Sequence, residues 1–201
     1  MKLQVFRKAI AFYITQPIVS LLARTSITPN MVTWTGFIII LIASALAAVG
    51  YPFAAGWVVL LSGFFDIIDG ALARRTHQVT RFGGVLDSTL DRLSEAAILT
   101  GVMAFFLFHS GSVLAPYIAL LIIITLTFSL LVSYIRSRAE AAGIDCEVGI
   151  FTRSERVIIL ALGLLLSAIP LVLVIVLVII ALLSIVTVIQ RLVHVYQKTK
   201  N

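Results

Sequence analysis

Long runs of apolar residues alternate with short polar connections along most of the chain. The apolar runs cover residues 31–49, 53–73, 93–108, 114–135, 157–169 and 171–193. A transmembrane helix needs about 20 consecutive apolar residues to cross the hydrocarbon core of a bilayer, and most of these runs approach that length. The pattern therefore predicts an all-α integral membrane protein with six transmembrane helices.

The start of the chain follows a different pattern. Apolar side chains there recur at helical spacing and form one stripe, which contains Leu3, Phe6, Ile10, Tyr13 and Ile14. Basic side chains alternate with them, and a helix with one apolar stripe and a basic remainder lies in the membrane interface. We therefore expect an N-terminal amphipathic interfacial helix at residues 2–22. It precedes a six-helix transmembrane core at 29–197, and residues 1–201 form one membrane domain.

The connections differ in charge between the two sides of the predicted bundle. Those at 50–52 and 109–112, and the segment around Pro170, contain no Lys, Arg, Asp or Glu. Pro170 marks either a turn or a kink, and the combined length of the last two runs favours a turn. Basic connections stay in the cytoplasm. We therefore expect both termini and all the ionic chemistry on the cytoplasmic side of the plasma membrane.

The composition agrees with lipid surroundings and narrows the choice of partners. Hydrophobic residues make up 61% of the 201 residues, against about 45–50% in a soluble domain. The net charge is +6, which favours anionic partners such as lipid headgroups, nucleotides or phosphorylated small molecules. The sequence contains no soluble basic domain, so nucleic acid is a poor candidate. One cysteine, Cys146, excludes an internal disulfide.

Four aspartates occur where two consecutive apolar runs meet their short polar connection. Asp66 and Asp69 are three residues apart near the end of the second run, and Asp87 and Asp91 are four apart at the start of the third. Each spacing places both carboxylates on one face of a helix. Because a short connection makes the two helices antiparallel neighbours, we expect two pairs of carboxylates to face each other.

Clustered carboxylates repel one another unless cations neutralise them. Oxygen ligands without His or Cys favour magnesium, manganese or calcium over zinc. Two Mg²⁺ ions, or Mn²⁺ in their place, would grip a pyrophosphate and stabilise a leaving phosphate. Salt bridges to nearby arginines are the structural alternative. Acids at membrane depth are generally functional, which favours the metal site.

The stretch DIIDGALARRTHQVTRFGGVLDSTLD has the pattern D-x2-D-G-x2-A-R-x8-G-x3-D-x3-D, the signature of CDP-alcohol phosphatidyltransferases. All eight fixed positions agree: Asp66, Asp69, Gly70, Ala73, Arg74, Gly83, Asp87 and Asp91. With average residue usage, a chance match at a given start is on the order of one in ten billion. Further segments, including SYIRSRAEAAG, RSERVII and VIQRL, resemble the bacterial phosphatidylinositol-phosphate synthases of that family.

The resemblance implies roles for individual residues. The first three acids, Asp66, Asp69 and Asp87, bind metal, and Asp91 acts as the general base and joins the metal ligands. The CDP-lipid is bound by Pro29, Asn30, Met31, Val32, Gly70, Ala73, Arg74 and Thr80. For residues 29–32 the alternative is simple helix capping, because a Thr cap followed by Pro is a normal helix start, and the two readings are compatible.

The resemblance also implies an acceptor site. The phosphate of inositol phosphate is bound by Ser133, Arg136, Arg156 and Arg191, although the family often has Lys at the second of these positions. The alternative for the arginines is the general excess of basic residues at cytoplasmic helix ends. The implied reaction transfers the phosphatidyl group of CDP-diacylglycerol to inositol 1-phosphate and releases CMP, in a homodimeric enzyme.

Other functions stay open at this point. Phosphatidylglycerol-phosphate synthase would also receive an anionic acceptor, whereas serine or free inositol would not require an arginine cluster. The donor lipid is either a diacylglycerol or an archaeal diether. A channel or transporter predicts acids at several depths, with its site near the midplane of the membrane. The acids of this chain are confined to one face, which argues against transport.

Overall fold

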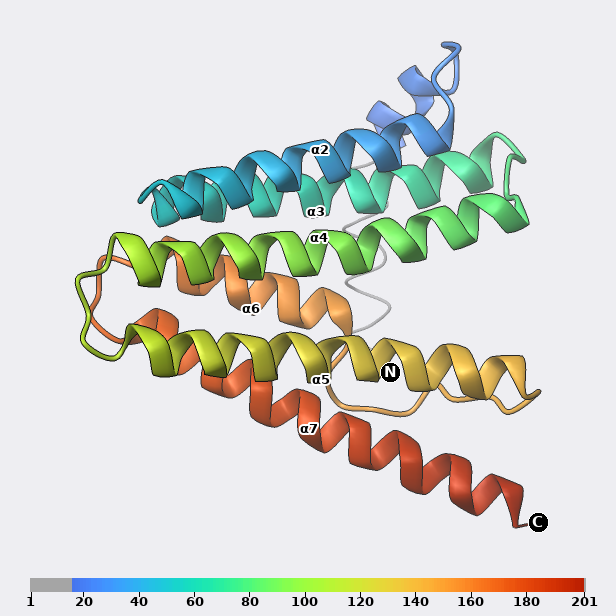
Figure 1. Cartoon of the computed structure of the whole chain (residues 1–201). Helices are drawn as coiled ribbons and strands as arrows, with labels where there is room; N and C mark the ends of the chain where they lie inside the picture. The colour runs from blue at the N-terminus through green and yellow to red at the C-terminus, as the bar shows by residue number, and fades with distance from the viewer. Residues whose placement is uncertain (1–15, 201) are drawn as a thin grey trace.

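The computed structural model describes residues 16–200, which form a bundle of helices without strands (Figure 1). Residues 16–22 are helical. Six helices follow: α2 (Pro29–Ala48), α3 (Pro52–Arg75), α4 (Arg81–Phe108), α5 (Ala115–Ala141), α6 (Arg153–Leu165) and α7 (Val172–Thr199). The all-α prediction is confirmed for this part of the chain. Most of the predicted interfacial helix, residues 2–22, lies outside the described residues.

Four of these helices, α2, α3, α5 and α7, are long and apolar enough to cross a membrane, which makes the chain a multi-pass membrane protein. Helix α4 has 28 residues, but the charged motif occupies its first half. Helix α6 has only 13 residues. At 1.5 Å per residue it spans about 20 Å, well short of the roughly 30 Å of hydrocarbon.

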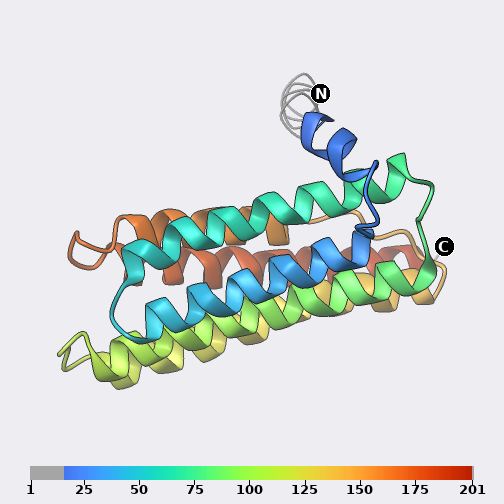
Figure 2. The same ribbon diagram turned by 90° about the horizontal axis from the view of Figure 1, so that it is seen from above.

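Consecutive helices run antiparallel, and their connections gather at two ends of the bundle (Figure 1, Figure 2). Residues 49–51, 109–114 and 166–171 lie at one end, and residues 76–80 and 142–152 lead away from the other. Pro170 lies in a turn between α6 and α7, so the prediction of a turn rather than a kink is confirmed. Helix α2 packs on α3 and α4, α3 on α6, α4 on α5, and α7 on both α5 and α6.

Helix α6 begins partway along the bundle rather than at its end (Figure 1). A capping box starts it: Thr152 N–H donates to Glu155 Oε2 at 2.5 Å, and the Thr152 hydroxyl accepts from the backbone N–H of Glu155. The connection before it is anchored by two buried side chains, Cys146 and Phe151. The first turn of α6 therefore lies between its neighbours at the level of the acidic residues of α3 and α4.

Small residues let α2 approach α4 closely. A Cβ added to Gly101 would lie 2.3 Å from the Ser44 carbonyl oxygen, so only glycine fits there. The Ser44 hydroxyl donates to the Ala97 carbonyl at 2.6 Å and ties the same two helices together. Contacts of small residues with interhelical hydrogen bonds are typical of helix packing in membranes. They fix the register in which the first turns of α2 and α4 meet.

Candidate active site

Three carboxylates converge where α3 faces α4. One oxygen each from Asp66, Asp69 and Asp87 lies within 4.8 Å of the others. Asp69 is only 6% exposed, and its Oδ2 has no hydrogen-bond partner among the described residues. A buried, unpartnered carboxylate oxygen beside two further acids is costly without a counter-charge. The donor set is all oxygen, so these residues fit a divalent cation such as Mg²⁺ or Mn²⁺.

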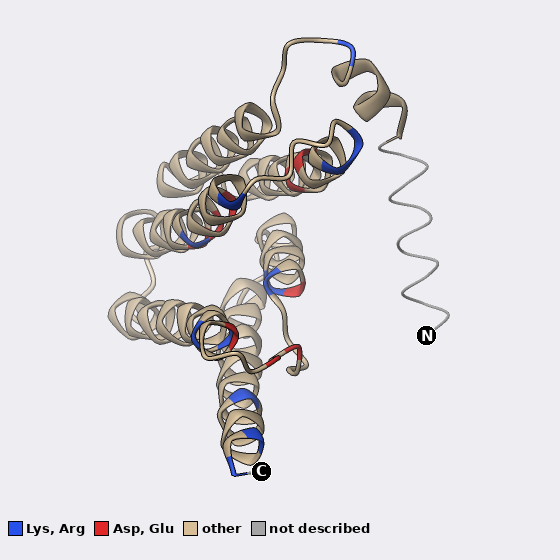
Figure 3. Cartoon of the chain, turned by 90° about the vertical axis from the view of Figure 1, so that its right-hand side faces the viewer, with Lys and Arg blue, Asp and Glu red and all other residues tan. Residues whose placement is uncertain are grey.

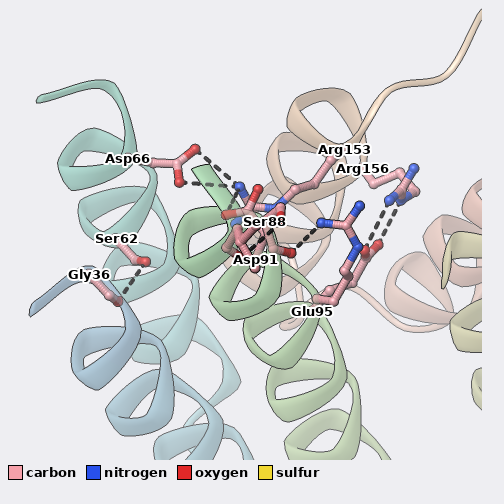
Figure 4. Close-up of polar contacts among 10 residues, drawn as sticks. Gly36, Ser62, Asp66, Ser88, Asp91, Glu95, Arg153 and Arg156 are labelled. Carbon is pink, nitrogen blue, oxygen red and sulfur yellow. Dashed lines mark hydrogen bonds and ion pairs between the residues drawn. The ribbon is translucent and has the colours of Figure 1, made fainter. Parts of the chain in front are cut away.

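Asp91 lies one turn after Asp87 on α4 and is outside that group of three. Its Oδ1 is 2.5 Å from Nη1 of Arg153. The same nitrogen donates to both carboxylate oxygens of Asp66, at 3.1 and 3.2 Å (Figure 4). Arg153 thus joins acids of α3 and α4 from the first turn of α6.

The sequence motif did not point to Arg153. The available signal was its position three residues before Arg156, which places both arginines on one face of α6. Glu95 lies outside the signature motif, although it follows Asp91 by one turn and therefore faces the same way. The structure brings these two residues into the site from α6 and α4. Figure 4 shows the charged side chains of the two helices reaching toward one another.

Glu95 and Arg156 form a buried ion pair. Arg156 Nε donates to Glu95 Oε1 at 2.6 Å, and Nη2 donates to Oε2 at 2.9 Å. The exposed fractions of the two side chains are 6% and 2%. Nη2 also contacts the Ser129 carbonyl on α5, at 3.4 Å. Such a fork-to-fork geometry fixes the plane and the orientation of the guanidinium group.

The residues predicted to bind the CDP-lipid lie at the ends of α2, α3 and α4. Thr80 caps α4 by accepting from Gly83 N–H at 2.9 Å. A Cβ on Gly83 would lie 3.0 Å from the Thr80 hydroxyl and 3.2 Å from Asn30 Oδ1, so the starts of α2 and α4 meet here. Arg74 folds back over Gly70, where a Cβ would be 3.4 Å from Nη1 of the arginine.

The remaining predicted donor-site residues surround this junction. Pro29, Met31 and Val32 form the first turn of α2, and Ala73 lies in the last turn of α3. The Thr28 hydroxyl accepts from Met31 N–H at 3.4 Å, so the helix-capping reading of this segment is confirmed. The first turn of α2, with the Asn30 side chain, thus lies beside Gly83 at the start of α4.

The residues predicted to bind the acceptor phosphate come from three helices. Arg191 on α7 donates through Nε to the Val148 carbonyl at 2.9 Å and through Nη1 to the Val132 carbonyl of α5, directly before Ser133. Arg136 and Arg156 are both electrostatic neighbours of Arg191. Arg136 is exposed and pairs with Glu140 at 2.7 Å. The structure therefore brings α5, α6 and α7 together around these side chains.

A cavity of about 310 Å³ lies between α3, α4 and α6. Asp66, Glu95, Arg153 and Arg156 line it at the level of the first turn of α6, and apolar residues such as Val59 and Leu160 line it farther along the helices. Viewed from the end where residues 76–80 lie, acidic and basic residues occur near one another on several neighbouring helices (Figure 3). One chamber thus joins charged groups to an apolar recess.

The sequence model of the CDP-alcohol phosphatidyltransferase family matches residues 26–196. The chain belongs to that family. It is therefore a membrane-embedded CDP-alcohol phosphatidyltransferase, an enzyme of phospholipid biosynthesis, and the resemblance carried by the aspartate motif is confirmed.

Two kinds of relatives are similar to this CDP-alcohol phosphatidyltransferase, one in sequence and one also in structure. An archaetidylinositol phosphate synthase from Methanothermobacter thermautotrophicus is 40% identical over 179 residues, covering 88% of this chain and 87% of that protein. The crystal structure of Mycobacterium tuberculosis phosphatidylinositol phosphate synthase with CDP-DAG bound has a TM-score of 0.83 at 35% identity, covering 92% of this chain and 94% of that chain. A structure of the mycobacterial enzyme in complex with manganese and citrate has the same TM-score and identity, covering 90% and 88%.

Proposed function

We propose that the enzyme transfers the phosphatidyl group of CDP-diacylglycerol to a hydroxyl of inositol 1-phosphate and releases CMP. The observation that carries the proposal is the combination of an acidic cluster on α3 and α4 with arginines converging from α6 and α7. The acidic cluster suits a pyrophosphate held through divalent cations, and the arginines suit a phosphorylated acceptor. Archaeal and bacterial relatives alike are named as inositol phosphate synthases, which supports this acceptor.

The four aspartates have different roles in the proposed reaction. Two divalent cations, held by Asp66, Asp69 and Asp87 with Asp91 at the second, would polarise the pyrophosphate and stabilise the charge on the leaving CMP. Asp91 takes the proton from the acceptor hydroxyl as its oxygen forms a bond to the lipid-side phosphorus. The bond from that phosphorus to the CMP phosphate oxygen breaks. Arg153 pairs with both Asp66 and Asp91 and thereby holds the acids of α3 and α4 together.

The donor site lies where the starts of α2 and α4 meet the end of α3. Asn30 and Thr80 present side-chain oxygens beside Gly83, and Arg74 offers a guanidinium group above Gly70. Residues 29–32 present the start of a helix, which favours anionic ligands. The apolar part of the 310 Å³ cavity would accommodate hydrocarbon from the lipid. The phosphates and the lipid tail would thus each have chemically suitable surroundings near the acids.

The acceptor site is proposed at Ser133, Arg136, Arg156 and Arg191. Arginines on three helices provide a positive enclosure for a dianionic phosphate, and charge-assisted hydrogen bonds of this kind are the strong ones. Free inositol or serine would offer these arginines no anionic partner beyond the acids that pair with Arg136 and Arg156. Glycerol phosphate would satisfy it, so phosphatidylglycerol-phosphate synthase activity is the alternative that the test must separate.

We further propose that all six helices α2–α7 lie in the plasma membrane and that the whole chain, 1–201, is one membrane domain with an interfacial helix at 2–22. The uncharged connections at 49–51 and 109–114 support placing the opposite, charged end in the cytoplasm. Both termini and the active site then face the cytoplasm. We expect a homodimer, as the family resemblance implies.

The proposal is tested by CMP release from purified protein in detergent with CDP-diacylglycerol and Mg²⁺. Inositol 1-phosphate, inositol, glycerol 3-phosphate and serine are supplied in turn, with the variant Asp91→Asn as the control. We expect turnover with inositol 1-phosphate alone and its loss in the variant. Preference for glycerol 3-phosphate would overturn the acceptor assignment, and an Asp91→Asn enzyme of normal rate would overturn the general base.

A second donor has an observation in its favour, because the archaeal relative is 40% identical and is named for an archaetidyl lipid. The same assay with a CDP-linked diether in place of CDP-diacylglycerol separates the two donors. A higher kcat/KM with the diether would replace the phosphatidyl group by the archaetidyl group. The acceptor assignment and the roles of the aspartates would be unaffected.

A further inference from the structure

Glu95 is an acid that the proposed chemistry does not use. It follows the general-base candidate Asp91 by one turn of α4, it is 6% exposed, and both of its oxygens are bonded to Arg156. Its charge is neutralised by the guanidinium group, and it lies outside the three acids that converge as a candidate cation site. The group through which it can act on the reaction is therefore the arginine that it holds.

The pairing divides the guanidinium group of Arg156 into two edges. Nε and Nη2 face Glu95, and Nη2 also contacts the Ser129 carbonyl. Nη1 is buried and has no hydrogen-bond partner among the described residues. Figure 4 shows this third nitrogen on the side of the guanidinium group away from Glu95. A buried donor without an acceptor is costly, and a ligand oxygen would satisfy it.

The surroundings of Arg156 indicate what kind of ligand would accept a hydrogen bond from its Nη1. Ser129 lies one turn before Ser133 on α5, and Arg191 from α7 is bonded to the intervening carbonyl of Val132. Arg156 and Arg191 are electrostatic neighbours. The free edge of Arg156 therefore lies in the positive region at which three helices converge, and an anionic oxygen is the acceptor that suits it.

We propose that Glu95 is a positioning residue for the acceptor, which fixes Arg156 through the bidentate pair so that its Nη1 donates to the acceptor phosphate. This proposal rests on the acceptor site proposed above. Glu95 also reduces the net charge of the pocket, because it neutralises one of the converging arginines. Arg156 is thereby a hydrogen-bond donor of fixed direction, and the net positive charge of the pocket is smaller. Both effects favour a ligand with the geometry of phosphate over other anions.

A purely structural role makes a different prediction. Replacing a buried ion pair by apolar residues of similar volume is often neutral or stabilising, whereas removing one partner leaves an uncompensated charge. A double variant, Glu95→Leu with Arg156→Met, should therefore fold and keep its thermal stability. If the pair serves only folding, this variant keeps its acceptor KM. If Arg156 is positioned for phosphate, it loses acceptor affinity despite being stable.

The experiment measures KM for inositol 1-phosphate and for CDP-diacylglycerol in Glu95→Gln, Glu95→Asp and the apolar double variant. Exposed Glu147, in the connection before α6, provides the control Glu147→Gln. We expect the acceptor KM of Glu95→Gln to rise about 10- to 100-fold, the factor for a lost hydrogen bond to a charged group. The donor KM should stay within about twofold, and Glu95→Asp, which keeps the carboxylate, should recover part of the loss.

A double-mutant cycle completes the test. Glu95→Gln combined with Arg156→Gln should raise the acceptor KM no further than Arg156→Gln alone, because the first residue acts through the second. Unchanged acceptor KM in Glu95→Gln, equal changes in both KM values, or a stable apolar double variant with normal acceptor KM would each overturn the proposal. A wild-type enzyme that does not use inositol 1-phosphate would instead overturn the proposed function, so the two failures are distinguishable.

Discussion

One nitrogen of Arg153 joins the carboxylates of two helices: Nη1 lies 3.1 Å from Asp66 Oδ2 and 2.5 Å from Asp91 Oδ1. The bridge brings the short helix α6 into the acidic site of α3 and α4. Asp66 belongs to the group of three converging acids, and Asp91 is the proposed base, so Arg153 contacts both the candidate cation site and the candidate base. Removing the Arg153 side chain should therefore change both the reaction rate and the affinity for cations.

The variant Arg153→Gln should lower kcat/KM by about 10- to 100-fold, since the ion pairs that orient the two carboxylates Asp66 and Asp91 are lost. It should also bind Mn²⁺ more tightly than the wild type, because a positive charge next to Asp66 is removed. Steady-state kinetics and calorimetric titration with Mn²⁺ measure the two effects. Arg75→Gln, at the exposed end of α3, is the control. Weaker Mn²⁺ binding in Arg153→Gln would contradict this account.

Asp69→Asn should separate stability from function. Loss of a metal ligand should reduce Mn²⁺ affinity by more than the roughly 10–100-fold that an outer-shell partner is worth, and activity should fall with it. In the presence of a chelator the variant should be at least as stable as the wild type, because the acids repel one another. Calorimetric titration and thermal unfolding with and without EDTA test both statements. Exposed Asp145 supplies the control Asp145→Asn, and a variant that binds Mn²⁺ normally would exclude Asp69 from the site.

The variant Arg136→Gln tests whether Arg136 binds the acceptor phosphate or is only one of the basic residues that are common at cytoplasmic helix ends. The pair with Glu140 is exposed at both ends, so its loss should change the free energy of unfolding by less than about 1 kcal/mol. If Arg136 binds the acceptor phosphate, KM for inositol 1-phosphate should rise about tenfold or more, with kcat less affected. The control is Arg138→Gln, exposed on the same helix. Equal acceptor KM values in the two variants would leave Arg136 as a positive-inside residue only.

Gly101→Ala should be strongly destabilising. The new Cβ would lie 2.3 Å from the Ser44 carbonyl oxygen, and two backbones cannot separate without breaking the α2–α4 contact. Overpacking of this kind costs about 1–3 kcal/mol or more. The matched control is Gly63→Ala on α3, where a Cβ meets nothing within 4 Å; helix propensity favours this change by up to about 1 kcal/mol. Thermal unfolding in detergent compares the two, and equal transition temperatures would contradict the packing argument.

The sequence predicted those parts of the molecule that local patterns determine. Asp66, Asp69 and Asp87 were expected to face one another because helical spacing and a short connection leave few alternatives, and the structure brings them within 4.8 Å. The turn at Pro170 followed from the length of the apolar run. The fifth span was predicted at 157–169, but α6 covers Arg153–Leu165, because hydropathy does not show where a helix is capped.

The remaining parts depend on tertiary contacts that no local pattern encodes. Arg153 and Glu95 gain their importance from the placement of the first turn of α6 between α3 and α4. That placement depends on the connection 142–152 and on its buried anchors, Cys146 and Phe151. From the sequence alone, Arg153 is a basic residue at a helix end, Arg156 has only the acceptor role that the resemblance implies, and Glu95 has no assigned role.

The short length of α6 has a consequence for how far water can reach into the proposed membrane domain. The 13-residue helix fills one part of the bundle's length, and residues 142–152 occupy the remainder as irregular backbone. Irregular backbone at membrane depth is tolerated only where protein or water covers it. Because Asp145 and Glu147 in this stretch are exposed, the proposed membrane placement would bring water to the flank where a full-length helix would otherwise exclude it. A sugar phosphate could then approach the reacting phosphorus from water, while the lipid approaches it from the hydrocarbon.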